Sequence, residues 1–257
     1  MGIPDELKAL RQWCWASLKP LPNGKPDKAP RQPDGTRASG ANPETWSTYA
    51  EIEEKVASDG GAAGFVLTES DPYTIIDLDA VDDAKVQEGQ RQVYEGFAGT
   101  YAEYSQSGRG THIVLRGKIG GGVRRKGVEV YDRDRLMICT GNPMEGRDLP
   151  IAEMQELVTE LVAGFGGLDA PGEMPEDYPE IQTDDKILRA LESACLLLRA
   201  RAASYGAGGS PARLAAVRAS VATDHGRPRL PGRRHSRVRG HRGRRRGRRG
   251  LGAGGMG

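Results

Sequence analysis

The 257-residue sequence has no long apolar run, no apolar segment near its start and few cysteines. A helix that crosses a bilayer needs about 20 predominantly apolar residues, so no membrane span is expected. A secretion signal would need an apolar stretch behind the first few residues, so none is predicted. Cys14, Cys139 and Cys195 form no C-x-x-C pair, which favours reduced thiols and a cytoplasmic location over a disulfide framework.

Residues 207–257 contain neither aromatic residues nor lysine, yet they hold fourteen arginines against one acid, Asp224. Such a segment cannot bury a core, and we predict that it is disordered. The rest of the chain then carries eleven more acids than bases. Two interpretations of the tail remain open. It is either a basic arm that binds nucleic-acid phosphate or an out-of-frame or truncated end, because Arg, Gly, Pro and Ala are the residues of GC-rich codons. We favour the second.

The order of the expected elements favours an α+β fold over a doubly wound sheet, because helices and strands do not alternate strictly. We expect a short helix and a strand within 3–17, an irregular loop at 19–44, helices at 42–57, 82–96 and 150–163, and strands at 62–68, 73–79, 101–106, 111–116, 127–131 and 134–140. We divide the chain into a domain at 1–165, a linker at 166–182, the start of a helical subdomain at 183–206 and the tail at 207–257.

Residues 73–79 read Tyr-Thr-Ile-Ile-Asp-Leu-Asp, and the first four predict a buried strand. Side chains alternate along a strand, so Leu78 can enter the core while Asp77 and Asp79 project from one face. Carboxylates that close repel each other, and a hard divalent cation such as Mg²⁺ or Mn²⁺ removes the repulsion. The pattern therefore indicates a metal site, or else a strand that runs into the acidic turn at Asp82 and Asp83.

The segment at 105–112, Ser-Gln-Ser-Gly-Arg-Gly-Thr-His, joins two expected strands. Gly108 and Gly110 allow the backbone to approach a ligand closely and to present N–H groups to an anion. Ser107 adds a hydroxyl donor, Arg109 adds charge, and His112 stands at the start of the next strand. The combination suits a triphosphate. The alternative is an ordinary hairpin with one surface histidine.

Glu129 lies between two valines of an expected strand, so alternation turns it to the face opposite them. It is a candidate third metal ligand beside Asp77 and Asp79, or a solvent-facing residue of a half-exposed strand.

Basic residues stand on both sides of this strand, with Arg124, Arg125 and Lys126 before it and Arg135 after it. They are candidate contacts to template or primer phosphate. The alternative for the first three is a solvated basic turn.

In this order, the Asp-x-Asp strand, the Ser-x-x-x-x-His segment and the later acidic strand resemble the archaeo-eukaryotic primase superfamily, and within it the primase-polymerase domains of phages and plasmids. The segments at 64–68, 129–131 and 135–141 also resemble that group, as do Lys28-Ala29-Pro30 and Thr45-Trp46 upstream. The resemblance covers roughly residues 8–165 and extends at most to about residue 205.

The resemblance implies a catalytic core built from an RRM-like palm and an αβ unit, followed by a helical segment. It implies a template-dependent nucleotidyltransferase that makes or extends primers in the DNA replication of a phage, plasmid or other mobile element. Asp77, Asp79 and Glu129 would hold two Mg²⁺ or Mn²⁺ ions, and Ser107 to His112 would hold the nucleoside triphosphate. Single-stranded DNA template, ribo- or deoxynucleoside triphosphates and a replicative helicase domain or protein would be its partners.

Two other classes share parts of this pattern. A replication-initiator or regulatory module could keep the fold without catalysis, although the full set of acids and His112 argues against it. A metal-dependent nuclease also clusters acids, but the Gly-rich segment before His112 favours a triphosphate over a phosphodiester that water attacks.

Overall fold

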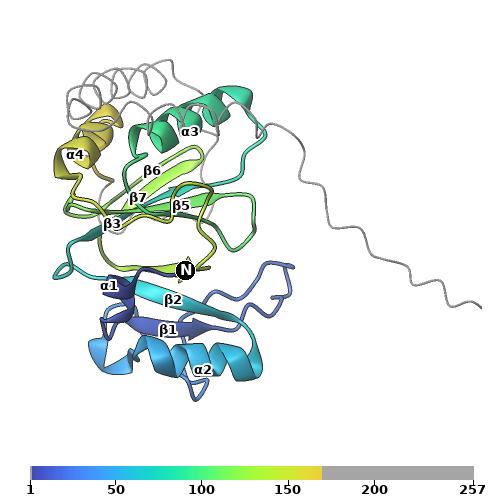
Figure 1. Cartoon of the computed structure of the whole chain (residues 1–257). Coiled ribbons are helices and arrows are strands. Elements are labelled where there is room, and N and C mark those ends of the chain that lie inside the picture. The colour runs from blue at the N-terminus through green and yellow to red at the C-terminus, as the bar shows by residue number, and fades with distance from the viewer. Residues whose placement is uncertain (1, 170–257) are drawn as a thin grey trace, which may run out of the picture.

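The computed structural model describes residues 2–169, which form two antiparallel sheets flanked by helices (Figure 1). The smaller sheet has the strand order β1-β2-β8, from β1 (Trp13–Ala16), β2 (Ala62–Leu67) and β8 (Arg135–Cys139). The larger has the order β4-β5-β3-β7-β6, from β3 (Tyr73–Leu78), β4 (Ala102–Tyr104), β5 (Thr111–Arg116), β6 (Gly122–Arg125) and β7 (Val128–Tyr131). The expected α+β class with antiparallel strands is therefore confirmed.

Within residues 2–169, four helices pack against the two sheets, and the first of them lies between the sheets, where Glu6 accepts from the Tyr73 hydroxyl of β3 at 2.8 Å. They are α1 (Asp5–Lys8), α2 (Tyr49–Asp59), α3 (Ala84–Gly96) and α4 (Gln155–Gly164), with a 3₁₀ turn η1 (Pro43–Thr45). In Figure 1, α3 and α4 lie over the larger sheet, and α2 lies against the smaller one at the opposite end of the molecule. Among the described residues, no helix has the length and apolar character needed to cross a membrane.

The structure differs from the expected elements in several places. The helix expected at 42–57 is divided into η1 and α2, because Thr48 caps α2 by accepting from the Glu51 N–H while Glu51 caps Thr48 in return. The last helix begins at Gln155 rather than at 150. Strand β6 is an addition to the expected elements, since Arg124 and Arg125 were interpreted as candidate phosphate contacts or, alternatively, as a solvated basic turn.

One core lies between the larger sheet and its helices. It contains Ile76 and Leu78 of β3, Val128 and Val130 of β7, and Val93 of α3, all buried. A second core joins the two sheets, and in it the rings of Trp13 and Phe65 lie 5.2 Å apart and those of Phe65 and Tyr73 lie 6.1 Å apart, edge to face. These cores fix the larger sheet from both sides.

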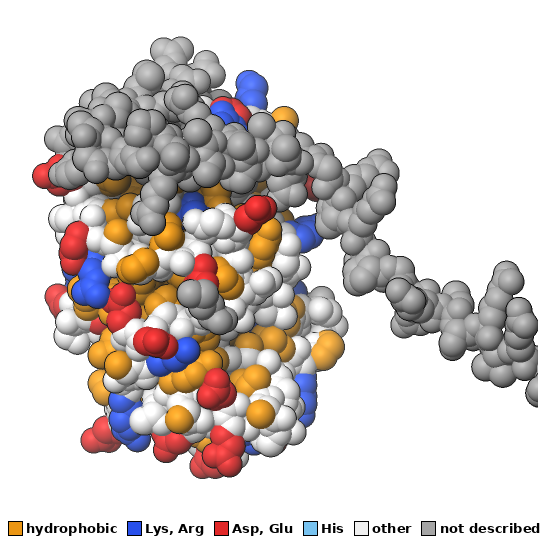
Figure 2. Space-filling view, in the orientation of Figure 1, with side chains coloured by type: hydrophobic (Ala, Val, Ile, Leu, Met, Phe, Trp, Pro, Cys, Tyr) orange, Lys and Arg blue, Asp and Glu red, His pale blue; other side chains and the backbone are white. Residues whose placement is uncertain are grey.

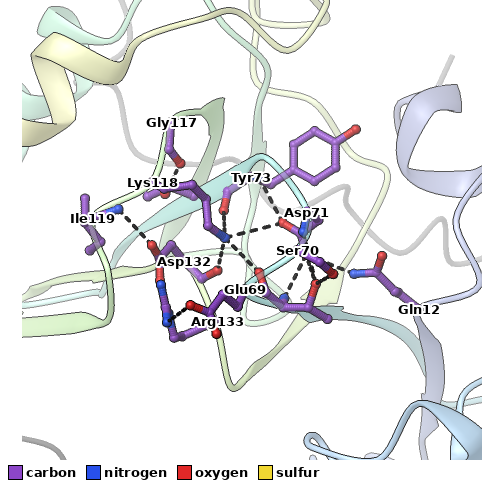
Figure 3. A network of polar contacts seen from close by, with 12 residues as sticks. Gln12, Glu69, Ser70, Asp71, Tyr73, Gly117, Lys118, Ile119, Asp132 and Arg133 are labelled. Atoms are coloured by element: carbon purple, nitrogen blue, oxygen red, sulfur yellow. Dashed lines mark hydrogen bonds and ion pairs between the residues drawn. The ribbon is translucent and has the colours of Figure 1, made fainter.

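A polar network also ties the sheets together where β3 begins (Figure 3). The buried Asp71 carboxylate accepts from Gln12 Nε2 at 2.9 Å and from the Tyr73 N–H at 2.9 Å. Lys118 Nζ lies 3.8 Å from Asp71 and donates to the Asp132 carbonyl at 2.5 Å. The Asp132 carboxylate in turn accepts hydrogen bonds from two backbone N–H groups of the loop after β5. The network therefore fixes the start of β3 against the ends of β5 and β7.

The expected helical subdomain at 183–206, the tail at 207–257 and most of the expected linker at 166–182 lie outside the described residues.

Candidate active site

One row of polar side chains crosses the larger sheet from edge to edge. Residues paired directly across antiparallel strands point to the same face, and the register pairs neighbours in the order Glu103, His112, Asp77, Glu129 and Arg124, from β4 to β6. The residues beside them in each strand face the apolar core instead. The strand pairing therefore brings together residues that lie far apart in the sequence.

Asp77 is the centre of this row. His112 Nε2 lies 3.7 Å from Asp77 Oδ1, and the Asp77 side chain keeps 24% of its surface exposed. Burial raises the pKa of Asp77, and the charge of Glu129 raises it further, whereas His112, Arg135 and Lys28 act against this shift. The carboxylate is thus partly withdrawn from water but still open to a ligand.

Asp79 follows the last residue of β3 and is still held in the sheet, because its N–H donates to the Gly127 carbonyl at 3.0 Å. Although the residue is exposed overall, partial withdrawal from water and then the charges of Asp77 and Glu129 raise its pKa to about 6. It also lines a cavity of about 360 Å³ together with Arg109 and Thr111. Asp77, Asp79 and Glu129 therefore act on one another electrostatically.

Glu129 is held by basic and hydroxyl groups. Its Oε2 accepts from Arg135 Nη2 at 3.1 Å and from the Tyr131 hydroxyl at 2.8 Å. Its Oε1 lies 3.8 Å from Arg124 Nε. Within residues 2–169, no three acidic, histidine or cysteine side chains are arranged as a group that could hold a metal ion. Glu129 lies beside Asp77, but in this conformation its carboxylate forms ion pairs with Arg135 and Arg124.

The hairpin between β4 and β5 carries the residues expected to bind triphosphate. The N–H groups of Gly108 and Gly110 are used inside the loop, donating to the Ser105 carbonyl at 2.8 Å and the Ser105 hydroxyl at 3.2 Å. Ser107 and Arg109 are exposed. A side chain at Gly110 would meet the Leu78 carbonyl at 2.7 Å, so glycine lets the hairpin lie against the strand of the two aspartates.

The expected nucleic-acid contacts separate into different places. Arg124 and Arg135 face Glu129. Arg125, the next residue in β6, points to the other face and donates to the Phe165 carbonyl at the end of α4 at 2.6 Å. Lys126 pairs with Asp83 at 2.9 Å. On the face seen in Figure 2, basic and acidic side chains are interspersed. The four residues thus do not make one continuous phosphate-binding surface.

Sequence reasoning missed three members of the site. Glu103 is buried and lies 3.4 Å from His112 Nδ1, and the signal for it was the same as for Glu129, an acid inside an apolar strand. The Tyr131 hydroxyl contacts Glu129. Lys28 comes from the long irregular loop, and its charge opposes the rise in the pKa of Asp77 and Asp79. No local pattern could place a residue of that loop beside these acids.

The fold and this row define an α+β protein with an acid–histidine site on one sheet face. No family model matches the chain. The chain is 33% identical over 178 residues to a protein named DNA primase-polymerase from the Nitratiruptor phage NrS-1, and the match covers 64% of this chain. This similarity confirms the resemblance to phage-type primase-polymerases. The chain spans about a quarter (24%) of the length of that relative.

Proposed function

We propose that this protein is a template-dependent nucleotidyltransferase that makes or extends primers in DNA replication. The observation that supports it most is the direct pairing of Asp77 with His112 on one side and with Glu129 on the other. The acids that would bind metal and the histidine that would contact phosphate then lie side by side, and Asp77 keeps 24% of its side-chain surface exposed. The similarity to a phage DNA primase-polymerase supports the same activity.

The donor set fits hard divalent cations such as Mg²⁺ or Mn²⁺, because it consists of carboxylates. Burial, and then the charge of neighbouring acids, raises the pKa values of Asp77 and Asp79, and a bound cation would relieve that repulsion. Asp77 and Asp79 would be the principal ligands, and Glu129 would join them. The chemistry supplied by two bound ions is activation of the attacking 3′-hydroxyl and neutralisation of charge on the α-phosphate and the departing pyrophosphate.

Glu129 has to exchange partners before it can act as a ligand. It is now neutralised by Arg135 at 3.1 Å, with Arg124 further away at 3.8 Å. Both guanidinium groups lie over the Tyr131 ring, with the Arg135 centre 4.5 Å and the Arg124 centre 5.4 Å from the ring centroid. Arg135, whose side chain is 36% exposed, is free to turn towards a triphosphate once Glu129 binds a cation.

His112 would donate to a β- or γ-phosphate oxygen, since a hard cation prefers oxygen and leaves the imidazole for the anion. Ser107 and Arg109 would contribute from the exposed hairpin tip. Because the N–H groups of Gly108 and Gly110 are used inside the loop, the hairpin would act through these two side chains unless it changes conformation.

The substrates proposed are a single-stranded DNA template and ribo- or deoxynucleoside triphosphates. A phage, plasmid or other mobile element in a bacterial cytoplasm is the proposed setting, and a replicative helicase domain or protein is the proposed partner.

Incorporation of labelled nucleotides on a single-stranded template, with Mg²⁺ or Mn²⁺, tests this function with the full chain. Labelled nucleotide should enter products of increasing length, with or without a primer. The matched control is the Asp77→Ala protein, prepared in the same way.

Three outcomes separate the classes. Products that grow with template support the proposal. DNA binding without incorporation, under conditions in which both metals have been tried, would indicate an initiator or regulatory module. Shortening of the template, lost in the same aspartate variant, would indicate a nuclease.

A further inference from the structure

Glu103 of β4 is a buried carboxylate that the proposed chemistry does not use. Its side chain keeps 1% of its surface exposed. Its Oε2 accepts from the Tyr101 hydroxyl at 2.8 Å and from the Gly141 N–H at 2.9 Å. Its Oε1 accepts from the Thr140 N–H at 3.0 Å and faces His112 Nδ1 at 3.4 Å. A buried acid with this many partners has a defined orientation.

The partners fix the direction of each hydrogen bond. Two are backbone N–H groups, which can only donate, and the Tyr101 hydroxyl donates to the same carboxylate. An ionised carboxylate is an acceptor at both oxygens. The remaining contact is then satisfied only if His112 Nδ1 carries the proton. The burial of Tyr101 and the negative charge of Glu103 both raise the pKa of that tyrosine, so its hydroxyl keeps the proton that it donates to the carboxylate.

The opposite nitrogen of the ring points to the centre of the site. His112 Nε2 lies 3.7 Å from Asp77 Oδ1, longer than a hydrogen bond but on the side of the acids. The imidazole is itself buried, with 8% of its side-chain surface exposed, so it cannot turn freely. A contact at Nδ1 decides which nitrogen is left for a ligand.

We infer that Glu103 is a positioning residue, which holds the His112 ring through Nδ1–H and directs Nε2 to the place where a substrate phosphate would lie. The kinetic part of this inference rests on the proposed nucleotidyltransferase function. The structural part does not, because the state of Nδ1 can be measured without substrate.

The first experiment is long-range ¹H–¹⁵N correlation of the histidine rings in the full chain, with the His112 signal identified by its loss in His112→Gln. The wild type should show a protonated Nδ1. In Glu103→Gln, where an amide replaces one acceptor oxygen, the signal should move to the other tautomer or to a mixture. Tyr101→Phe is the matched control, because it removes another partner of the same carboxylate and should leave the His112 signal unchanged.

The second experiment is a double-mutant cycle on the Michaelis constant for nucleotide. Glu103→Gln alone should raise KM about tenfold, as expected for the weakening of one charge-assisted hydrogen bond to substrate, with little change in single-stranded DNA affinity. In a His112→Ala background the same substitution should have no further effect on KM, because Glu103 acts through the ring.

The outcomes are separable. An unchanged His112 tautomer in Glu103→Gln, or additive effects in the cycle, would overturn the inference and leave Glu103 as an anchor for the chain at 140–141. If the wild type incorporates no nucleotide, the proposed function fails, and the ring spectra still decide whether Glu103 positions His112.

Discussion

The two faces of the larger sheet are made by the same strands, yet around Asp77 they have different roles, although further along the strands both faces pack into a core. On one face Ile76, Leu78 and Val130 pack beneath the helices and are at most 6% exposed. On the other face Asp77 and Glu129, their neighbours in the same strands, keep 24% and 16% of their side-chain surface open. Alternation along a strand separates stability from chemistry by a single residue. Substitutions on the two faces should therefore differ in kind.

The largest effect is expected on the polar face. Asp77→Ala should lower nucleotide addition by on the order of a thousandfold or more, the scale seen when a transition-state charge contact is removed. Its unfolding free energy should stay equal or increase, because one of several repelling carboxylates is gone. Incorporation rates and denaturant unfolding of the same preparation measure both. Asp82→Ala, an exposed acid outside the row, is the control, and an active Asp77→Ala protein would contradict the assignment.

The apolar face should respond in the opposite way. Ile76→Ala removes a fully buried side chain next to Asp77 and should cost about 2–5 kcal/mol of unfolding free energy. The catalytic rate per folded molecule should stay close to that of the wild type at a temperature where the variant is folded. Loss of activity in a well-folded Ile76→Ala protein would contradict the claim that residues beneath the helices contribute to stability and not to catalysis.

His112→Ala should be next in size and selective. Losing a charge-assisted hydrogen bond should cost on the order of 1.5–3 kcal/mol, or roughly a ten- to hundredfold loss in kcat/KM for nucleotide. Binding of single-stranded DNA should be nearly unchanged. Nucleotide titrations and DNA binding on one preparation test this, and the reverse result would mean that His112 faces the template.

The smallest effect concerns pH and Asp79. Its pKa is raised from 3.8 to about 6 in the folded protein, so the folded state holds this proton more tightly than the unfolded state. That stabilisation is complete below about pH 4 and is lost as the pH rises through 6. Metal-free Asp79→Asn should therefore gain stability over the wild type above pH 6, by on the order of 1 kcal/mol because solvent screens an exposed group.

Thermal unfolding across this pH range measures the difference. Added Mg²⁺ should raise the Tm of the wild type more than that of Asp79→Asn. A difference between the two proteins that does not depend on pH would show that Asp79 does not titrate in this way.

The sequence was sufficient for most of this sheet because period-two patterns mark its strands. Val128 and Val130 around Glu129 predicted both the strand and the face of its acid. The same reasoning failed at β6. Arg124 pairs with Glu129 on the neighbouring strand, and Arg125 donates to the end of α4, so neither arginine shows the alternation of apolar and polar residues that marks the other strands. Three basic residues in a row, Arg124 to Lys126, are locally typical of a solvated turn.

Two features of the site could not be predicted from local sequence patterns: the alignment of its strands and the hydrogen bonds inside its hairpin. The register that pairs Asp77 with Glu129 depends on how β3 and β7 align, and no local pattern specifies that alignment. Likewise, the hairpin at 105–110 was expected to offer its N–H groups to an anion, but Ser105 accepts from them instead. Local competition of this kind is visible only once the loop is built.

The position of β3 has a consequence for how this molecule can move. β3 is bonded to β5 on one side and to β7 on the other, so its amide protons should exchange with solvent only when the sheet itself opens. Moving Asp77 out of its place while the rest of the protein stays folded would therefore cost much free energy, because two ladders of hydrogen bonds would have to open. Adjustment to different templates or nucleotides must come from the surrounding segments, such as the exposed hairpin tip at Ser107 and Arg109 and the loop that carries Lys28, while the strand between them stays still.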